Sequence, residues 1–305
     1  MQTLWGQIAV ADAHVHFFSR SFLRQLAVQK GGSATPADLC VTLGWEPPPE
    51  TAEQCAAQWA AELVRNEVSQ ATLIASLPGE EDSVLAAVAA FPGRFFGWFF
   101  LNPMAPDARD RCERGFRNGL KAVCLLPAMH NYSLGDARVD EIFRTAAACR
   151  ATIFVHCGVL SVGFRHRLGL PCPFDMRYSN PLDLHPLALK YPGVNIVIPH
   201  FGAGFFREAL MLADMCPNVY MDTSSSNAWT RYLTPPPTLE QVFRQALSVV
   251  GPRRLLFGTD SSYFPRGWHK LVFDDQVNAL WKVGIRGDDA ADILGGNLRS
   301  LMRGR

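Results

Sequence analysis

The chain of 305 residues is long enough for one large domain or two ordinary ones. Hydrophobic residues make up 48% and charged residues 19%, a balance typical of a compact globular enzyme with a large core. Lysine and arginine (29) nearly balance aspartate and glutamate (28), and no basic run occurs, which argues against nucleic acid or an anionic membrane surface as a partner. A small-molecule substrate is the expected partner.

The eight cysteines are scattered without a CxxC pair, unlike those of a small secreted disulfide scaffold. The first residues lack the basic and apolar regions of a signal peptide. No apolar stretch reaches the roughly 18 residues that are needed to cross a membrane. We therefore expect reduced cysteines and a cytoplasmic protein.

Eight short apolar segments punctuate the chain, each four to seven residues long and rich in Val, Ile, Phe and Leu. Their hydrophobicity is nearly continuous, which predicts strands that are buried on both faces of a parallel sheet. In chain order they are residues 8–12, 71–76, 95–101, 120–126, 152–156, 195–199, 219–222 and 255–258.

Longer, helix-like segments lie between these strands. Strand and helix repeated eight times indicate a (β/α)₈ (TIM) barrel more than a doubly wound sheet, in a single domain over residues 1–305. The expected helices include residues 52–66, 83–90, 105–118, 139–149 and 181–190.

Four connections are long, and each of them follows a predicted strand: residues 17–51, 158–180, 223–238 and 261–273. In a barrel these loops gather over the C-terminal mouth, where substrates bind. We expect them to form pocket walls, and we interpret residues 17–66 as a lid insertion after the first strand. Disordered surface decoration is the alternative for the first loop.

The first strand leads into the motif Asp12-Ala13-His14-Val15-His16. Alternate residues of a strand point the same way, so His14 and His16 project side by side. Two neutral imidazoles in this arrangement can share one cation. An HxH pair alone is weak evidence, because two ordinary polar residues give the same pattern.

Three more polar residues end predicted strands: His156 the fifth, His200 the sixth and Asp260 the eighth. A single histidine at the end of an apolar strand is usually a hydrogen-bonded structural residue. Four histidines and a carboxylate at one rim are harder to assign to structure, because a barrel places its catalytic groups there. The set predicts a metal centre.

These motifs, in this order, resemble the amidohydrolase superfamily, and the resemblance spans residues 12–302. The flanking residues are similar to the branch that includes the aminocarboxymuconate semialdehyde decarboxylase-like enzymes and many amidohydrolase-related proteins. They are Pro199-His200-Phe201-Gly202-Ala203-Gly204, Asn218-Val219-Tyr220-Met221-Asp222-Thr223-Ser224, Gly258-Thr259-Asp260 and Gly296-Asn297-Leu298.

The resemblance implies a metal held by His14, His16, His156 and Asp260. Asp260 would also handle a proton, and His200 would lie beside the metal. There His200 would polarise the substrate, hold the attacking water or stabilise the developing oxyanion.

One divalent metal ion is expected. Binuclear relatives carry a carboxylated lysine at the end of the fourth strand, where this chain has Leu125 and Leu126; Lys121 comes too early. Cys124 is interpreted as a core residue. Zinc is the first choice, because it suits three imidazoles, a carboxylate and a water; manganese and iron are alternatives.

The positions of further residues around this site predict their roles. Asp12 is expected to bond backbone rather than metal, and Asp222 to accept a hydrogen bond from a ligand histidine or to cap a helix. Solvated loop arginines are common, but arginines and aromatics in the mouth loops suggest an anionic or aromatic substrate. The substrate-binding candidates are Arg266, Trp268, Tyr263, Arg165, Arg177 and Trp229, with Arg167 and Arg231 as further arginines.

Hydrolysis of an amide, ester or lactone by a metal-activated water is the leading reaction. Non-oxidative decarboxylation of an aromatic or unsaturated carboxylate is the alternative. The segment Asp260-Ser261-Ser262 departs from the Asp-Tyr-Pro of many decarboxylases of the branch, which favours the hydrolase. A non-catalytic ligand-binding barrel is the third reading, because fold does not imply function. A homodimer is expected only by analogy with the branch.

Overall fold

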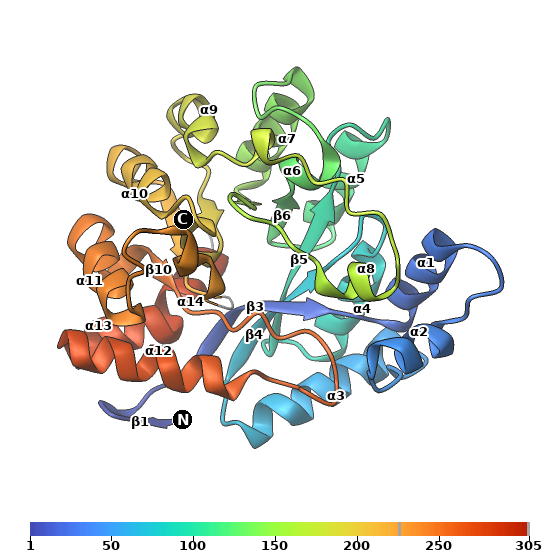
Figure 1. Cartoon of the computed structure of the whole chain (residues 1–305), viewed down its shortest axis with the longest axis horizontal. Helices are drawn as coiled ribbons and strands as arrows, with labels where there is room; N and C mark the ends of the chain where they lie inside the picture. Colours follow the sequence, from blue (N-terminus) through green and yellow to red (C-terminus); the bar gives the residue numbers. More distant parts are fainter. Residues whose placement is uncertain (225–226, 304–305) are drawn as a thin grey trace.

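Eight parallel strands form the centre of the molecule, and helices surround them (Figure 1). The computed structural model describes residues 1–224 and 227–303. Each strand is hydrogen-bonded to the next strand of the chain. The strands are β3 (Ala11–Phe17), β4 (Gln70–Ala75), β5 (Phe95–Leu101), β6 (Ala122–Leu125), β7 (Thr152–Val155), β8 (Ile196–Ile198), β9 (Val219–Asp222) and β10 (Leu255–Leu256).

The sheet closes between β3 and the segment that follows β10. Ala13 N donates to Phe257 O at 2.8 Å, and His16 N donates to Ser261 O at 2.7 Å. The predicted (β/α)₈ barrel in one domain is therefore confirmed.

The prediction for the first strand, residues 8–12, is wrong by several residues. Strand β3 runs from Ala11 to Phe17, so the two histidines lie inside the strand rather than past its end. The apolar run stops at residue 12, but the strand continues, because its backbone pairs with β4 as far as Phe17. Before it, β1 (Gln2–Thr3) and β2 (Gly6–Gln7) form a small antiparallel hairpin.

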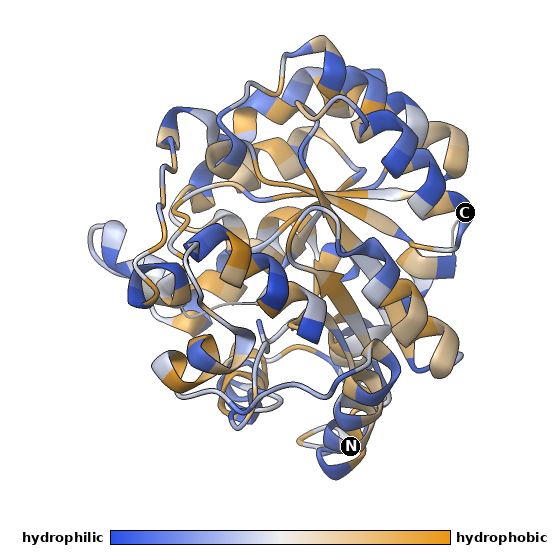
Figure 2. Ribbon diagram, turned by 90° about the vertical axis from the view of Figure 1, so that its right-hand side faces the viewer, coloured by the Kyte–Doolittle hydropathy of each residue, from blue (hydrophilic) through white to orange (hydrophobic). Residues whose placement is uncertain are grey.

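The outer layer consists of amphipathic helices whose hydrophilic faces point outward (Figure 2). Two of them, α3 and α11, begin with a capping box, in which Thr51 and Thr238 satisfy the first backbone N–H groups. The layer contains α3 (Ala52–Arg65), α4 (Glu81–Ala90), α5 (Ala108–Arg117), α7 (Ala137–Cys149), α9 (His185–Lys190), α10 (Phe206–Met215), α11 (Leu239–Val250) and α12 (Lys270–Val283).

The N-terminal end of the barrel is filled by apolar side chains. Helix α14 (Asn297–Arg303) contributes Leu298, Leu301 and Met302 to the cluster inside the strands. The indole of Trp98 on β5 donates to Met302 Sδ at 3.2 Å. Only the opposite, C-terminal end of the barrel is left for a site.

The loops after β3 and β7 form a second, smaller hydrophobic cluster over the mouth. It contains Phe22 and Leu26 of α1 (Arg20–Lys30), Leu39 and Leu43 of α2 (Pro36–Leu43), and Leu168 beyond α8 (Gly163–Arg167). We call residues 17–45 together with 163–170 the cap. The first loop is thus folded, whereas α3 packs into the barrel's outer layer. Action of residues 17–66 as a lid stays a prediction.

No helix among the described residues is both long and apolar enough to span a bilayer.

Gly158, just after β7, lies where a side chain has no space. A Cβ there would be 2.1 Å from Gly202 O, and φ is 80°. We expect Gly158→Ala to lower the free energy of unfolding by about 2–4 kcal/mol, because left-handed backbone and overpacking each cost on the order of 1–3 kcal/mol. Gly193→Ala is the matched control, since its Cβ meets nothing within 4 Å. Equal denaturant midpoints for the two variants would contradict this account.

Candidate metal centre

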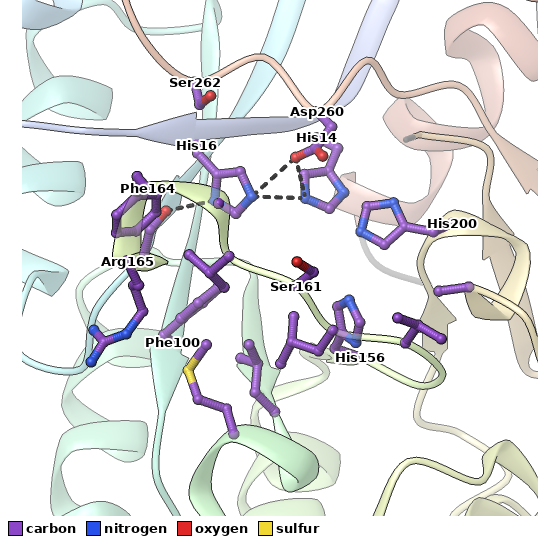
Figure 3. A pocket seen from close by; sticks show the side chains of 18 of the residues that line it. His14, His16, Phe100, His156, Ser161, Phe164, Arg165, His200, Asp260 and Ser262 are labelled. Carbon is purple, nitrogen blue, oxygen red and sulfur yellow. Dashed lines mark hydrogen bonds and ion pairs between the residues drawn. The ribbon is translucent and has the colours of Figure 1, made fainter. Parts of the chain in front are cut away.

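Three side chains converge at the floor of the mouth (Figure 3). His14 and His16 project from the same face of β3, and their Nε2 atoms are 3.4 Å apart. Asp260 Oδ1 lies 3.1 Å from His16 Nε2 and 3.7 Å from His14 Nε2. The described ligand atoms of this group all lie within 4.8 Å of one another, which is the spacing of a metal site.

The rim of the barrel holds Asp260 and His200 in left-handed backbone conformations. Their φ angles are 59° and 56°, and Phe201 and Ala203 follow at 50° and 43°. Such residues cost on the order of 1–2 kcal/mol each when they are not glycine, and they cluster at functional sites. Asp260 is also fixed by its backbone N–H, which donates to His14 O at 3.0 Å.

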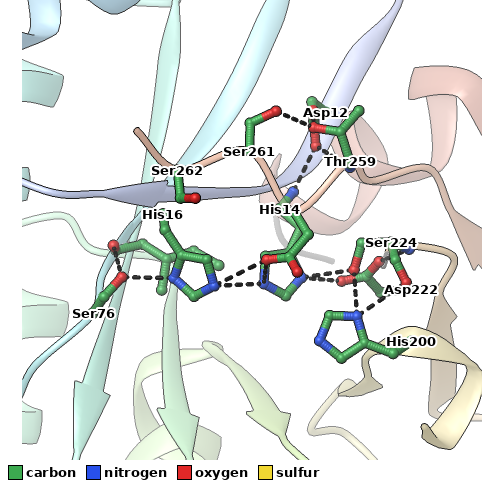
Figure 4. Close-up of polar contacts among 12 residues, drawn as sticks. Asp12, His14, His16, Ser76, His200, Asp222, Ser224, Thr259, Ser261 and Ser262 are labelled. Atoms are coloured by element: carbon green, nitrogen blue, oxygen red, sulfur yellow. Dashed lines mark hydrogen bonds and ion pairs between the residues drawn. The ribbon is translucent and has the colours of Figure 1, made fainter. Parts of the chain in front are cut away.

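Two buried neighbours set the tautomer of His14 (Figure 4). Its Nδ1 lies 2.6 Å from Asp222 Oδ2 and 2.9 Å from Ser224 Oγ. An ionised carboxylate only accepts hydrogen bonds, so we assign the proton to Nδ1 and a lone pair to Nε2. Burial alone lowers the pKa of His14, but the charge and hydrogen bond of Asp222, together with the charges of Asp260 and Asp12, outweigh burial and raise the pKa.

A serine sets the tautomer of His16 in the same way. His16 Nδ1 is 2.6 Å from Ser76 Oγ, and the Ser76 hydroxyl donates to Ile74 O at 2.9 Å. Because the Ser76 hydroxyl donates its proton to Ile74 O, its oxygen can only accept from His16 Nδ1–H. His16 Nε2 therefore carries a lone pair, as His14 Nε2 does. Burial lowers the pKa of His16, which favours the neutral ring.

Two imidazole lone pairs and a carboxylate oxygen thus face one another. Burial raises the pKa of Asp260, but His16 and His14 beside it bring the pKa below its usual range, so the carboxylate is ionised. Three electron-rich atoms this close require a proton or a metal cation between them. Neutral imidazole and carboxylate are ligands of zinc and its neighbours, so the group fits a divalent metal.

His200 stands next to this group without belonging to it. Its ring centroid is 5.0 Å from that of His14. His200 Nδ1 lies 3.0 Å from Ser224 O, a carbonyl that can only accept, so Nδ1 carries the proton. Burial and the charge of His14 lower the pKa of His200, which leaves a neutral ring with a lone pair on Nε2.

His156, the fourth predicted ligand, is near but apart from the group (Figure 3). Its ring centroid is 5.3 Å from that of His200. Burial and the charge of His200 put its pKa well below the usual range, and Nδ1 is buried with no partner among the described residues. The structure thus brings three of the four predicted ligands together, and ligation by His156 stays a prediction.

The two flanking carboxylates lie where a supporting role is possible. Asp222 contacts His14, which agrees with the first of the two roles predicted for it, a hydrogen bond with a histidine. Asp222 Oδ1 also accepts from Ser224 N at 2.5 Å. Asp12 accepts from His14 N at 2.8 Å and from Thr259 Oγ1 at 2.5 Å. Burial raises the pKa of Asp12 to about 6.

A cavity of about 550 Å³ opens above the three converging side chains. Four of the residues predicted to bind substrate line it: Arg266, Tyr263, Arg165 and Trp229. Sequence reasoning missed other lining residues, some of them in the long loops and some in or just after strands β4, β5 and β6. They include Phe18, Trp45, Ser76, Phe100, Met129, Leu160 and Phe164.

Two of the substrate-binding predictions are corrected by the structure. Trp268 is buried away from the cavity, because its indole N–H donates to Asp12 Oδ2 at 2.8 Å and its ring packs on Phe273. Arg177 points to solvent with 83% of its side chain exposed and pairs with Asp175 at 2.5 Å. Neither residue lines the cavity.

The fold and the three converging side chains define a (β/α)₈ barrel with a candidate divalent-metal site at its mouth. A family model described as amidohydrolase (Amidohydro_2) matches residues 11–301, and the chain belongs to this family of metal-dependent enzymes. Protein FluG of Emericella nidulans is 36% identical over 220 residues, which are 66% of this chain and 24% of FluG. The chain therefore matches about a quarter of the length of that curated relative.

Solved structures share the fold at low identity. The 5-carboxyvanillate decarboxylase LigW of Sphingomonas paucimobilis is 16% identical with a TM-score of 0.63, covering 98% of this chain and 100% of that one. A probable 2-pyrone-4,6-dicarboxylic acid hydrolase of Acinetobacter baumannii, with citric acid bound, is 14% identical with a TM-score of 0.61, covering 97% and 100%. A zinc-bound amidohydrolase of Burkholderia multivorans is 15% identical with a TM-score of 0.57, covering 97% and 99%.

We predict that the purified protein binds about one zinc or manganese ion per chain. His14→Ala should lose this ion, because it removes one of the converging lone pairs. Elemental analysis after purification without chelators measures the content, with the surface variant Arg177→Ala as control. Two ions per chain, or none after reconstitution, would contradict the site.

Asp222→Asn tests whether the neighbour of His14 supports metal binding. We expect a loss of about 10–100-fold in zinc affinity, the usual effect of removing such an outer contact. Competition with a chromogenic chelator measures the affinity, and Asp175→Asn changes a surface carboxylate as control. Unchanged affinity in Asp222→Asn would show that the His14 contact is structural only.

Proposed function

We propose that this protein is a metal-dependent hydrolase of an amide, ester or lactone in a small substrate that carries a carboxylate or an aromatic ring. The observation that carries the proposal is the convergence of His14 Nε2, His16 Nε2 and Asp260 Oδ1 at the floor of a cavity. A structural zinc site would be closed and rich in cysteine, whereas this group opens into the mouth.

His14, His16 and Asp260 would hold the cation, with His156 as fourth ligand. Zinc is the first choice, with manganese and iron as alternatives. A bound divalent cation supplies Lewis acidity that polarises a carbonyl and lowers the pKa of a water.

Asp260 would move the proton of the attacking water. Its Oδ1 faces the two histidines, while its Oδ2 bonds to no described residue. The side chain is 35% exposed and lines the cavity, so water and substrate can reach it. The ionised carboxylate would accept a proton from water and return it to the leaving group.

His200 is better suited to hold the water than to stabilise an oxyanion. A neutral ring with its proton on Nδ1 offers a lone pair at Nε2, so it accepts a hydrogen bond. Stabilising an oxyanion would require a donor at Nε2. Of the roles considered for His200, orienting the attacking water is therefore the one we propose.

Arg266 would bind an anionic group of the substrate. Its Nη2 donates to Asp260 O and to Ser262 Oγ, both at 2.9 Å, so the guanidinium sits beside the metal ligands. It forms no ion pair with any carboxylate of residues 1–224 or 227–303. An unpaired guanidinium matches a carboxylate well.

The same placement of Arg266 favours decarboxylation as the second candidate function. A substrate carboxylate held by Arg266 beside Asp260 would be positioned to leave as carbon dioxide, with a proton added to the carbon. The two reactions differ in their products. We therefore screen zinc-loaded and manganese-loaded protein against two groups of substrates. One group contains lactones, amides and esters, and the other contains aromatic carboxylates. Proton release detects hydrolysis, and carbon dioxide release detects decarboxylation. If no substrate releases either product, a ligand-binding barrel is favoured.

Asp260→Asn should lower turnover by about 10²–10⁴-fold while keeping the fold, because an amide cannot take the proton. Circular dichroism and metal content serve as controls, and turnover is compared at equal metal loading. Near-normal turnover in Asp260→Asn would remove the proposed mechanism.

A further inference from the structure

A stack of aromatic rings runs from the cap to the guanidinium of Arg266. Phe22 and Phe18 have centroids 4.2 Å apart with a 7° angle between their planes, and Phe18 and Trp45 follow at 5.3 Å and 17°. Trp45 then stacks on Tyr263 at 4.8 Å and 13°. Arg266 Cζ lies 4.7 Å from the Tyr263 centroid and ends the stack.

The contact between Trp45 and Tyr263 is where the cap meets the loop after β10. The next residue of each segment is also in contact: Glu46 N donates a backbone hydrogen bond to Phe264 O at 2.8 Å. Phe164, from the other part of the cap, packs edge-on against Trp45 at 5.7 Å. Trp45 therefore packs against both parts of the cap, residues 17–45 and 163–170, and its ring stacks on that of Tyr263.

Arg266 depends on this support for a defined position. Its side chain is exposed, and an exposed arginine loses rotamer entropy when it binds a ligand. Two hydrogen bonds hold Nη2, and the Tyr263 ring lies under the guanidinium plane. A guanidinium fixed before binding loses less entropy, which strengthens binding.

The other arginines of the cavity wall are engaged elsewhere, and one of them, Arg231, donates to Tyr232 Oη at 2.8 Å. Arg165 donates to Gln29 Oε1 at 2.8 Å and to Pro171 O at 3.0 and 3.1 Å, and Arg167 donates to Thr42 O at 2.9 Å. These bonds join α8 to α1 and α2, so both arginines fasten the cap. Arg266 is the cavity arginine bonded to a metal-ligand residue.

We propose that Trp45 is a positioning residue for anion binding. Packed between Phe18 and Tyr263, it keeps the Tyr263 ring against Arg266 and so holds the guanidinium beside Asp260, ready for a substrate carboxylate. The inference rests on the proposed role of Arg266, and it adds that the cap sets how tightly the anionic group is bound.

Zinc-loaded protein is titrated by calorimetry with benzoate and with benzamide, which share a ring and differ in charge. Trp45→Ala should weaken benzoate binding by about 10-fold, the scale of a charge-assisted hydrogen bond, and change benzamide binding by less than about 2-fold. Trp45→Phe should restore most of the benzoate affinity. Trp281→Ala, which changes an exposed tryptophan of α12, is the matched control and should change neither.

Arg266→Gln separates this inference from the proposed function. If Arg266 binds the anion, Arg266→Gln weakens benzoate, and Trp45→Ala adds no further loss in that background. Equal losses for benzoate and benzamide in Trp45→Ala, or a full extra loss in the double variant, would overturn the role of Trp45 alone. Unchanged benzoate binding in Arg266→Gln would overturn the role of Arg266 and the inference with it. If Trp45→Ala does not fold, Trp45→Leu replaces it in the same cycle.

Discussion

The bond from His14 Nδ1 to the buried carboxylate of Asp222 is the contact on which the site depends. It turns the lone pair of His14 toward His16 and Asp260, and without it the ring has no preferred face. Asp222 ends β9 and His14 lies on β3. The bond therefore joins two strands that have β10 between them, at the place where the barrel closes. Gly258 makes this approach possible, because a Cβ there would lie 2.9 Å from both Asp222 Oδ1 and the His14 Cβ.

The rim residues show how the closed barrel holds conformations that a free chain would avoid. Asp260 and His200 adopt left-handed backbone; Asp260 N donates to His14 O of β3, and Ala203 N donates to His200 O in a tight turn. A parallel barrel with a filled interior cannot relax such residues locally, since every strand is fixed on both sides. The packing of the whole fold offsets the conformational free energy of these residues. As a result, several electron-rich atoms face one point.

Much of the fold followed from the apolar runs, because buried parallel strands are continuous in hydrophobicity. Strands β5 and β9 lie at the predicted residues, whereas β3 was misplaced because polar residues interrupt its apolar pattern. The HxH motif and the end of the last predicted strand located His14, His16 and Asp260. They could not show that His156 stands apart, since side-chain distances across a barrel depend on its diameter and stagger. Trp268 was misassigned because its partner, Asp12, is 256 residues away in the sequence.

Helix α14 has a further consequence for how the chain reaches this structure. The inner faces of β3 and β5, made of Ala11, Ala13 and Trp98, are covered by Leu298, Leu301 and Met302. During synthesis the ribosome releases β3 hundreds of residues before α14. The part of the barrel lining that α14 covers therefore stays open to water, and to other apolar surfaces, until α14 has emerged. A chain that has not yet produced α14 therefore exposes apolar side chains at the base of the barrel, at the end opposite the candidate metal centre.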